Sequence, residues 1–175
     1  MWYFFGISAV FLVLDQVTKN YMAALLPLCV PGYCQSIEIL PFFKLTVLHN
    51  TGAAFSFLAD AGGWQRGFLV AVSLVVSLFI GGWLFRIHRE QRLLAYALAF
   101  ILGGALGNLV DRALQGYVVD FLVFHYEVYY FPAFNIADTA ISLGAGLLII
   151  DMFKQGKKEA NKRIMSQLDP EPGLP

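Results

Sequence analysis

Four long apolar runs divide the chain, and each is long enough to cross a membrane as a helix. They lie at about residues 2–26, 67–85, 93–110 and 137–153. A bilayer core roughly 30 Å thick requires about 20 mostly apolar residues in helical form. Asp15 and Lys19 interrupt the second half of the first run, whereas the second run carries no charge. The pattern predicts an all-α integral membrane protein with four transmembrane helices.

A cleaved secretory leader is the alternative explanation for the first run. Such a leader has a basic segment before its apolar part and small residues at a cleavage site. Only Met1 precedes Trp2, and no A-x-A sequence follows the run. We therefore expect residues 2–26 to be retained as a membrane span.

A shorter pattern, with a period of two residues, lies between the first two runs. Its apolar positions are Ile37, Ile39, Leu45 and Val47. Polar residues separate them and Pro41 interrupts them, which is typical of short half-buried strands. We expect a small β-containing extension in the outer loop at about 27–66. Cys29 and Cys34 in this loop either pair, in an oxidising compartment, or stay as free thiols.

Composition supports a membrane protein and excludes several other classes. Hydrophobic residues make up 58% of the 175 residues and charged residues only 14%, whereas soluble domains have about 25% charged residues. The formal net charge is zero, which argues against a nucleic-acid-binding protein. With two cysteines and no metal-ligand or phosphate-loop motif, we expect no metal and no cofactor.

The distribution of basic residues predicts the orientation in the membrane. Eight of the twelve lie either between the second and third runs or just after the fourth. Cytoplasmic segments are enriched in Lys and Arg, so both termini are expected in the cytoplasm. The outer, periplasmic loops are then at about 27–66 and 111–136. Residues 154–175 are expected to form a basic and then disordered cytoplasmic tail.

Half of the residues from 121 to 134 are aromatic. Aromatic residues concentrate where a membrane meets water, so an anchoring belt is one interpretation. A lid that rests beside a site is the other, and the sequence leaves both open.

Ionisable residues gather at the outer ends of the predicted spans. Charged groups inside a membrane are costly and usually functional. Asp15 and Lys19 are one helical turn apart, so a local ion pair that stabilises the helix is as plausible as a functional role. Asn108, Asp111 and Arg112 emerge where the third helix should meet the interface.

Two further acids, Asp120 and Asp138, are expected at the same interface. Asn135 is a good N-cap residue, which would place Asp138 in the first turn of the fourth helix. Stabilisation of that helix start is the simple interpretation of Asp138. Two adjacent carboxylates, however, share one proton and can serve as general acid and general base. Such a pair suits peptide hydrolysis.

A small proton-coupled transporter is the alternative, although its acids would be expected near the membrane midplane. A non-enzymatic scaffold would need no acid pair.

Five sequence blocks resemble the lipoprotein signal peptidase family, also called signal peptidase II. They are Asp15-Gln16-Val17-Thr18-Lys19, Asn50-Thr51-Gly52-Ala53-Ala54-Phe55, the segment from Gly104 to Arg112 (G-x-x-G-N-L-x-D-R), Val118-Val119-Asp120-Phe121 and Phe134-Asn135-Ile136-Ala137-Asp138. The resemblance extends over residues 1–153. It implies that these residues form one membrane peptidase domain.

The resemblance implies an aspartyl endopeptidase of the bacterial cytoplasmic (inner) membrane. Such enzymes cut diacylglyceryl-modified prolipoproteins just before the lipidated cysteine, at the outer interface, and are inhibited by globomycin-type cyclic peptides. By motif position, Asp120 and Asp138 would be the catalytic pair. The residues that would line or support the cleft are Asp15, Lys19, Asn50, Gly52, Gly104, Asn108, Arg112, Asn135 and Ala137. For Asp111 we favour a structural role, because it precedes Arg112 at a helix end. Membrane lipid is the other expected partner, and the chain is expected to act as a monomer.

Overall fold

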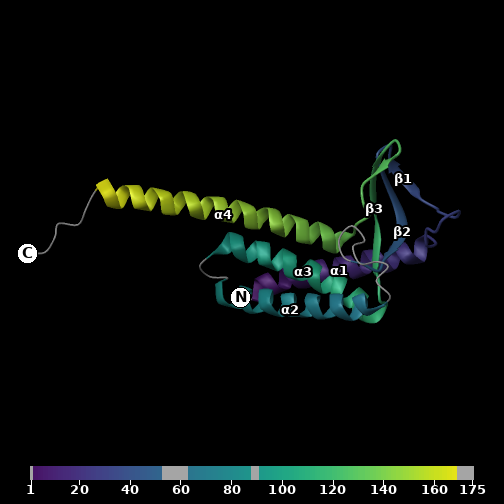
Figure 1. The fold of residues 1–175 in the computed structure, drawn as a ribbon, viewed down its shortest axis with the longest axis horizontal. Helices are drawn as coiled ribbons and strands as arrows, with labels where there is room; N and C mark the ends of the chain where they lie inside the picture. The colour runs from purple at the N-terminus through teal and green to yellow at the C-terminus, as the bar shows by residue number, and fades with distance from the viewer. Residues whose placement is uncertain (1, 53–62, 88–90, 169–175) are drawn as a thin grey trace, which may run out of the picture.

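Four long helices lie side by side, and a small sheet stands at one end of them (Figure 1). The computed structural model describes residues 2–52, 63–87 and 91–168. The elements in chain order are α1 (Trp2–Leu25), β1 (Ile37–Leu40), β2 (Phe43–Asn50), α2 (Trp64–Ile87), α3 (Arg92–Leu114), β3 (Val118–Tyr126), β4 (Tyr129–Tyr130) and α4 (Ile136–Leu168).

Three of these helices are long and apolar enough to cross a membrane. They are α2, α3 and the Ile136–Met165 part of α4. Helix α1 also has 24 residues, but Asp15 and Lys19 make its second half more polar. The outer surface of α2 is apolar and exposed, as at Val75, Leu78 and Phe79. A surface of this kind is suited to lipid rather than to water.

Helix α4 is longer than the apolar pattern predicts. The expected span ended at about residue 153 and was followed by a tail that became disordered after Arg163, whereas the helix continues to Leu168. Residues 154–168 are mostly good helix formers such as Lys, Glu, Ala and Gln. After the start of α4 the first proline is Pro170. The basic segment is therefore part of α4, and it projects away from the other helices (Figure 1).

The sheet is antiparallel, with strand order β1-β2-β3-β4. The expected strands in the first outer loop are confirmed as β1 and β2, on either side of Pro41. The sequence pattern predicted strands only in the first outer loop, whereas β3 and β4 lie in the second. Val118 to Phe121, at the start of β3, are all buried. A strand that is buried on both faces shows a continuous apolar run instead of alternation, so the pattern gave no signal.

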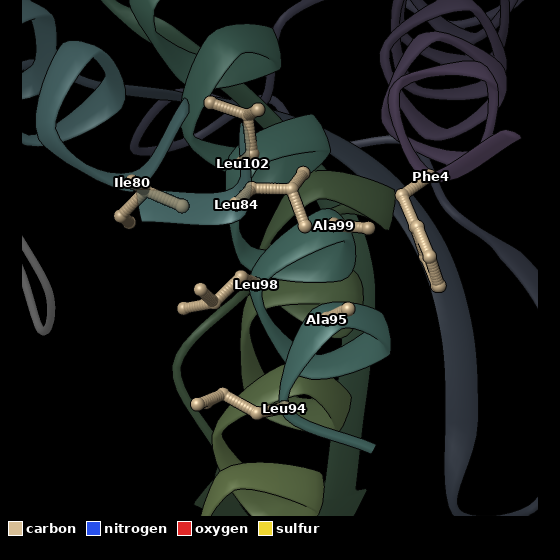
Figure 2. Close-up of a cluster of buried hydrophobic side chains, with 8 residues drawn as sticks. All are labelled: Phe4, Ile80, Leu84, Leu94, Ala95, Leu98, Ala99 and Leu102. Atoms are coloured by element: carbon tan, nitrogen blue, oxygen red, sulfur yellow. The ribbon is translucent and has the colours of Figure 1, made fainter. Parts of the chain in front are cut away.

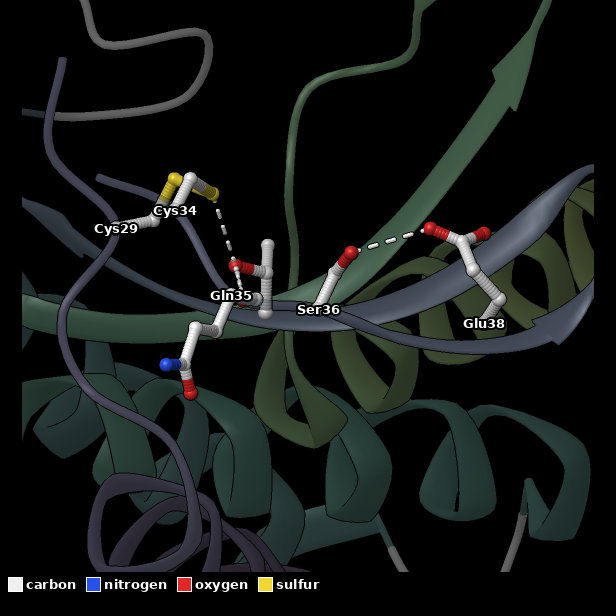
Figure 3. The surroundings of a disulfide bond; sticks show 6 residues. Cys29, Cys34, Gln35, Ser36 and Glu38 are labelled. Atoms are coloured by element: carbon white, nitrogen blue, oxygen red, sulfur yellow. Dashed lines mark hydrogen bonds between the residues drawn. A yellow bond between two sulfur atoms is a disulfide. The ribbon is translucent and has the colours of Figure 1, made fainter. Parts of the chain in front are cut away.

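A disulfide joins Cys29 to Cys34, so the two cysteines are paired rather than free. Figure 3 shows this bond beside Gln35, whose carbonyl accepts a hydrogen bond from Thr46 Oγ1 at 2.9 Å. The Cys29 backbone N–H donates to Val47 O at 2.8 Å. The segment that follows α1 is thereby attached to β2 at both ends of the disulfide loop.

Helix α3 is the centre of the helical core and packs on α1, α2 and α4. Figure 2 shows one buried cluster, in which Leu84 of α2 and Phe4 of α1 lie near Ala95 and Ala99 of α3. Alanine and glycine at such positions let helix backbones approach closely, as is common in membranes. A Cβ on Gly144 of α4 would lie 2.7 Å from the Ala97 carbonyl oxygen. The contact between α3 and α4 therefore requires glycine at this position.

Gly144→Ala should lower the midpoint of thermal unfolding in detergent. The added methyl must displace backbone atoms of α3, and overpacking of this kind typically costs about 1–3 kcal/mol. Gly146→Ala is a matched control on the same helix, because a Cβ there meets nothing within 4 Å. That control should be neutral or slightly stabilising, since alanine favours helix. Equal midpoints for both variants would contradict close packing at Gly144.

Candidate functional site

The ends of several elements meet where the sheet joins the helices. The second half of α1, the last turns of α3, the end of β2, the start of β3 and the first turn of α4 all contribute polar side chains. All twelve residues singled out from the sequence lie in this region, and the structure describes each of them. Ala53, Ala54 and Phe55 of the same sequence block lie outside the described residues.

Asn135 connects the two candidate acids. Its side-chain oxygen accepts a hydrogen bond from the Asp138 backbone N–H at 2.9 Å, so it is the N-cap of α4, as its spacing from Asp138 predicts. Its amide nitrogen donates to Asp120 Oδ1 at 2.7 Å. Asn135 is fully buried. One side chain thus fixes both the start of α4 and the orientation of the Asp120 carboxyl group.

Two further amides each bind one carboxyl oxygen of the acids. Asn50, at the end of β2, donates to Asp120 Oδ2 at 3.1 Å. Asn108 of α3 donates to Asp138 Oδ1 at 2.8 Å. Asp120 is buried and Asp138 is half-buried. Each carboxyl group is therefore positioned by at least one side-chain amide, and Asp138 is the more accessible of the two.

Lys19 is a buried cation with three oxygen partners. Its Nζ lies 2.7 Å from Asp15 Oδ2 and 2.8 Å from Asp111 Oδ2, and it donates to Asn108 Oδ1 at 2.9 Å. Only 2% of Lys19 is exposed. The local pair with Asp15 is present, but Lys19 also binds α3 through two residues far away in the sequence. This makes it a junction between helices rather than a support for α1 alone.

The two acids bound to Lys19 also hold backbone segments. Asp15 Oδ1 accepts a hydrogen bond from the Ala137 N–H at 2.8 Å, at the start of α4. Asp111 Oδ2 accepts one from the Val119 N–H at 3.3 Å. Gln16 adds a bond of 2.7 Å to Asp111 Oδ1. Because Val119 and Ala137 each adjoin a residue of the site, these bonds determine where β3 and α4 enter it.

Glycine permits close approach at two points of this network. A Cβ on Gly104 would collide with the Ala137 carbonyl oxygen, and one on Gly107 would lie 2.5 Å from Asp15 Oδ2. Ala137 itself is fully buried. The small residues of α3 therefore set the distance between α3 and the first turn of α4.

Arg112 joins the end of α3 to the segment after β2. Its Nη2 donates to the Gly52 carbonyl at 2.9 Å, and the Gly52 N–H donates to Asn50 Oδ1 at 3.0 Å. Sequence reasoning did not identify Arg66, which donates to the Arg112 and Ala113 carbonyls at 3.1 and 2.8 Å. It belongs to no motif and lies in the first turn of α2, an ordinary apolar helix, so the sequence carried no signal for it.

A cavity of about 940 Å³ opens beside these polar groups. Its polar end has Asn50, Asn108, Arg112 and Asp138, and the rest of its wall is mainly apolar. The aromatic segment contributes Phe124, Phe131 and Phe134 to the lining, whereas Tyr126, Tyr129 and Tyr130 are exposed. The same segment thus supplies both a wall of the cavity and aromatic groups on the outer surface.

Electrostatics distinguish Asp120 from an ordinary surface acid. Burial, and then the neighbouring charge of Asp138, raise the pKa of Asp120 to about 7. Hydrogen bonds from Asn50 and Asn135 and the charge of Lys19 act in the opposite direction. A carboxyl group with such a pKa can hold or release a proton near neutral pH. The described residues include no group of three or more His, Cys, Asp or Glu side chains arranged to hold a metal ion.

Comparison with known proteins gives consistent matches. A family model described as signal peptidase (SPase) II matches residues 7–154. A lipoprotein signal peptidase of Alteromonas mediterranea is 54% identical over 159 residues, which are 91% of this chain and 85% of that protein. Another, from Acinetobacter baumannii, is 51% identical over 148 residues, which are 85% of this chain and 81% of that protein.

Two solved structures have the same fold. Both are described as bacterial membrane enzymes. The first has a TM-score of 0.78 and 26% identity, and the alignment covers 100% of this chain and 96% of that one. The second has a TM-score of 0.74 and 29% identity, with 88% and 94% coverage.

Lys19→Met should destabilise the protein strongly. Removal of the cation leaves Asp15 and Asp111 buried without their partner, and breaking a buried pair in this way costs about 3–5 kcal/mol. Lys157→Met is a matched control, because Lys157 is exposed on α4. The measurement is the midpoint of unfolding in detergent at neutral pH. If the two variants unfolded at the same midpoint, the junction role of Lys19 would be refuted.

Proposed function

The chain belongs to the signal peptidase II family, and we propose that Asp120 and Asp138 are the acid pair with which it cuts prolipoproteins. It is a lipoprotein signal peptidase, at about half sequence identity to curated relatives over most of its length. These relatives give no support to the transporter alternative. The observation that carries the proposal is that Asn135 binds both the Asp120 carboxyl group and the Asp138 backbone N–H, and that Asp138 lines a large cavity.

The proposed topology has four membrane spans, with α1 as the first. Its apolar half and its exposed residues such as Val10, Val13 and Val17 are suited to contact with lipid. The basic segment of α4, the last turn of α2 and the first turn of α3 lie at the ends opposite the sheet (Figure 1). By the positive-inside rule these ends, and both termini, are cytoplasmic. The sheet, the disulfide and the acid pair are then on the outer side of the inner membrane, where disulfides form.

The proposed substrate is a prolipoprotein that carries a diacylglyceryl group on a cysteine. Such a substrate stays in the bilayer, so its scissile bond must be cut at the interface. The cavity suits it, because polar groups at one end can bind peptide and the apolar remainder can accommodate acyl chains. Cleavage falls just before the lipidated cysteine. The cavity would also bind globomycin-type peptides, and the chain is proposed to act as a monomer.

We assign Asp138 as the general base and Asp120 as the general acid. Asp120 is the more buried, and its pKa of about 7 keeps it protonated under mildly acidic to neutral conditions. Asp138 lies in the first turn of α4, where the helix dipole favours a negative charge, and it borders the cavity. The assignment follows the general rule that environment separates the roles of two adjacent acids.

The reaction needs no covalent enzyme intermediate. Asp138 takes a proton from water as the water oxygen attacks the scissile carbonyl carbon, and Asp120 donates its proton to the carbonyl oxygen. The resulting diol collapses when Asp138 donates its proton to the leaving amine, and Asp120 recovers a proton from a diol hydroxyl. The C–N bond breaks, and the products are the signal peptide with a carboxylic acid end, which ionises in water, and the free amino group of the lipidated cysteine. Both acids return to their starting states.

Cleavage of a diacylglyceryl-modified prolipoprotein by the purified full-length chain tests the acid pair. Asp120→Asn and Asp138→Asn should each lower the rate by about 10²- to 10⁴-fold, because general acid–base catalysis contributes this much. Asp151→Asn is the matched control, since Asp151 lies on α4 far from the site and accepts a bond from Gln155. It should cut at the wild-type rate.

Unfolding midpoints of all three variants ensure that a loss of activity is not a loss of structure. A folded Asp120→Asn or Asp138→Asn variant that cuts normally would overturn the catalytic assignment while leaving the family membership intact. Asp111→Asn should remain active, because we place that carboxylate with Lys19 rather than in the reaction.

The pH dependence of kcat/KM should show an alkaline limb near pH 7. Activity requires protonated Asp120, so it falls as pH rises through its pKa of about 7. The hydrogen bond from Asn50 lowers this pKa. Asn50→Ala removes it, so Asp120 stays protonated longer and the limb moves to higher pH. Asn161→Ala, an exposed change on α4, should leave the limb in place. An unmoved limb in Asn50→Ala would exclude Asp120 as the group that titrates.

A further inference from the structure

The cavity beside Asp138 extends between α2 and α4, where its walls are mainly apolar. Leu69 of α2 and Ile141 and Leu143 of α4 line this part. Two serine side chains, Ser73 of α2 and Ser142 of α4, interrupt the apolar surface. They face one space from two different helices, so a single ligand in the cavity can reach both.

The two serine hydroxyls are available as donors. Over residues 2–52, 63–87 and 91–168, neither side chain forms a hydrogen bond with another residue; Ser73 is half-buried and Ser142 is exposed. Thr139 also lines the cavity, but its hydroxyl already donates to the Asn135 carbonyl at 2.9 Å. An unpaired hydroxyl in apolar surroundings is unfavourable. Ser73 and Ser142 are therefore suited to an acceptor that a ligand brings with it.

The position of Ser142 relative to Asp138 limits what that acceptor can be. The two residues are four positions apart on α4, so Ser142 lies on the same face, about 6 Å further along the helix. On the proposed orientation this direction leads into the bilayer. In a lipidated substrate, the cysteine side chain and the glycerol separate the scissile amide from the first ester carbonyl. Those carbonyls can thus lie roughly one helical turn inward from the reacting bond.

We propose that Ser73 and Ser142 recognise the substrate's lipid by donating hydrogen bonds to the ester carbonyl oxygens of its diacylglyceryl group. The inference rests on the proposed function and adds which groups of the lipid the enzyme recognises, namely the ester carbonyls. Ester carbonyls accept hydrogen bonds and donate none, which matches two free donors. The acyl chains beyond them then run along Leu69, Ile141 and Leu143 towards the bilayer. The serines bind substrate and take no part in the proton transfers.

The test compares two substrates that differ only in their carbonyls. One prolipoprotein peptide carries an ester-linked diacylglyceryl group on its cysteine, and the other carries ether-linked alkyl chains of the same length. Wild type should favour the ester, by kcat/KM, by about 3- to 10-fold, as expected for the loss of one or two hydrogen bonds. The double variant Ser73→Ala, Ser142→Ala should lose this preference, because its activity falls on the ester and stays nearly constant on the ether.

Ser77→Ala is the matched control. Ser77 lies one turn from Ser73 on α2, is only 4% exposed and does not line the cavity, so its variant should keep the ester preference. Equal losses on ester and ether would assign the serines to packing or to the peptide chain and overturn the proposal. A wild type without ester preference would overturn it as well. If wild type cut neither substrate, the proposed function itself would fail, which is a distinct result.

Discussion

The rest of the site depends on one interaction, the binding of the buried Lys19 ammonium group by the oxygen atoms around it. A charge removed from water is tolerated only when other groups compensate it at close range. Here Asp15, Asp111 and Asn108 supply that compensation from two helices. The remaining oxygens of the same acids then bind the backbones of Val119 and Ala137. One cation therefore indirectly fixes the positions of Asp120 and Asp138, although among the described residues it forms an ion pair with neither carboxyl group.

Asn135 is a second residue that links two parts of the site. Its side chain accepts a hydrogen bond from a backbone N–H in the first turn of α4 and also donates one to Asp120. A buried amide has both donors and an acceptor, so it can link a helix terminus to a strand side chain without an added charge. Asn50 and Asn108 each donate to one further carboxyl oxygen, of Asp120 and Asp138 respectively. Three neutral amides around two carboxyl groups orient the acids while adding no charge that would hold both of them ionised.

Local patterns in the sequence predicted the parts of this structure that depend on local physics. Apolar runs located the helices, alternation located β1 and β2, and the spacing of Asn135 and Asp138 predicted the N-cap. The partners of Lys19 on α3 and the role of Arg66 depend on contacts between distant segments, which spacing does not encode. The pattern did not predict β3, because the first residues of this strand are buried on both faces and show no alternation. The residues alone suggested that Asp120 and Asp138 lie at one interface, but their assignment as the catalytic pair came from resemblance to a family, since two isolated acids in a sequence do not show that they meet.

The continuous helix from Ile136 to Leu168 has a practical consequence. Its 33 residues extend for about 50 Å at 1.5 Å per residue, whereas the hydrocarbon core is only about 30 Å thick. On the proposed topology, the last turns stand clear of the bilayer, at the end of the molecule furthest from the sheet (Figure 1). A fluorescent or affinity tag fused after this helix would be held away from both lipid and the cavity. The carboxyl end is thus the natural place to attach a reporter for imaging or purification.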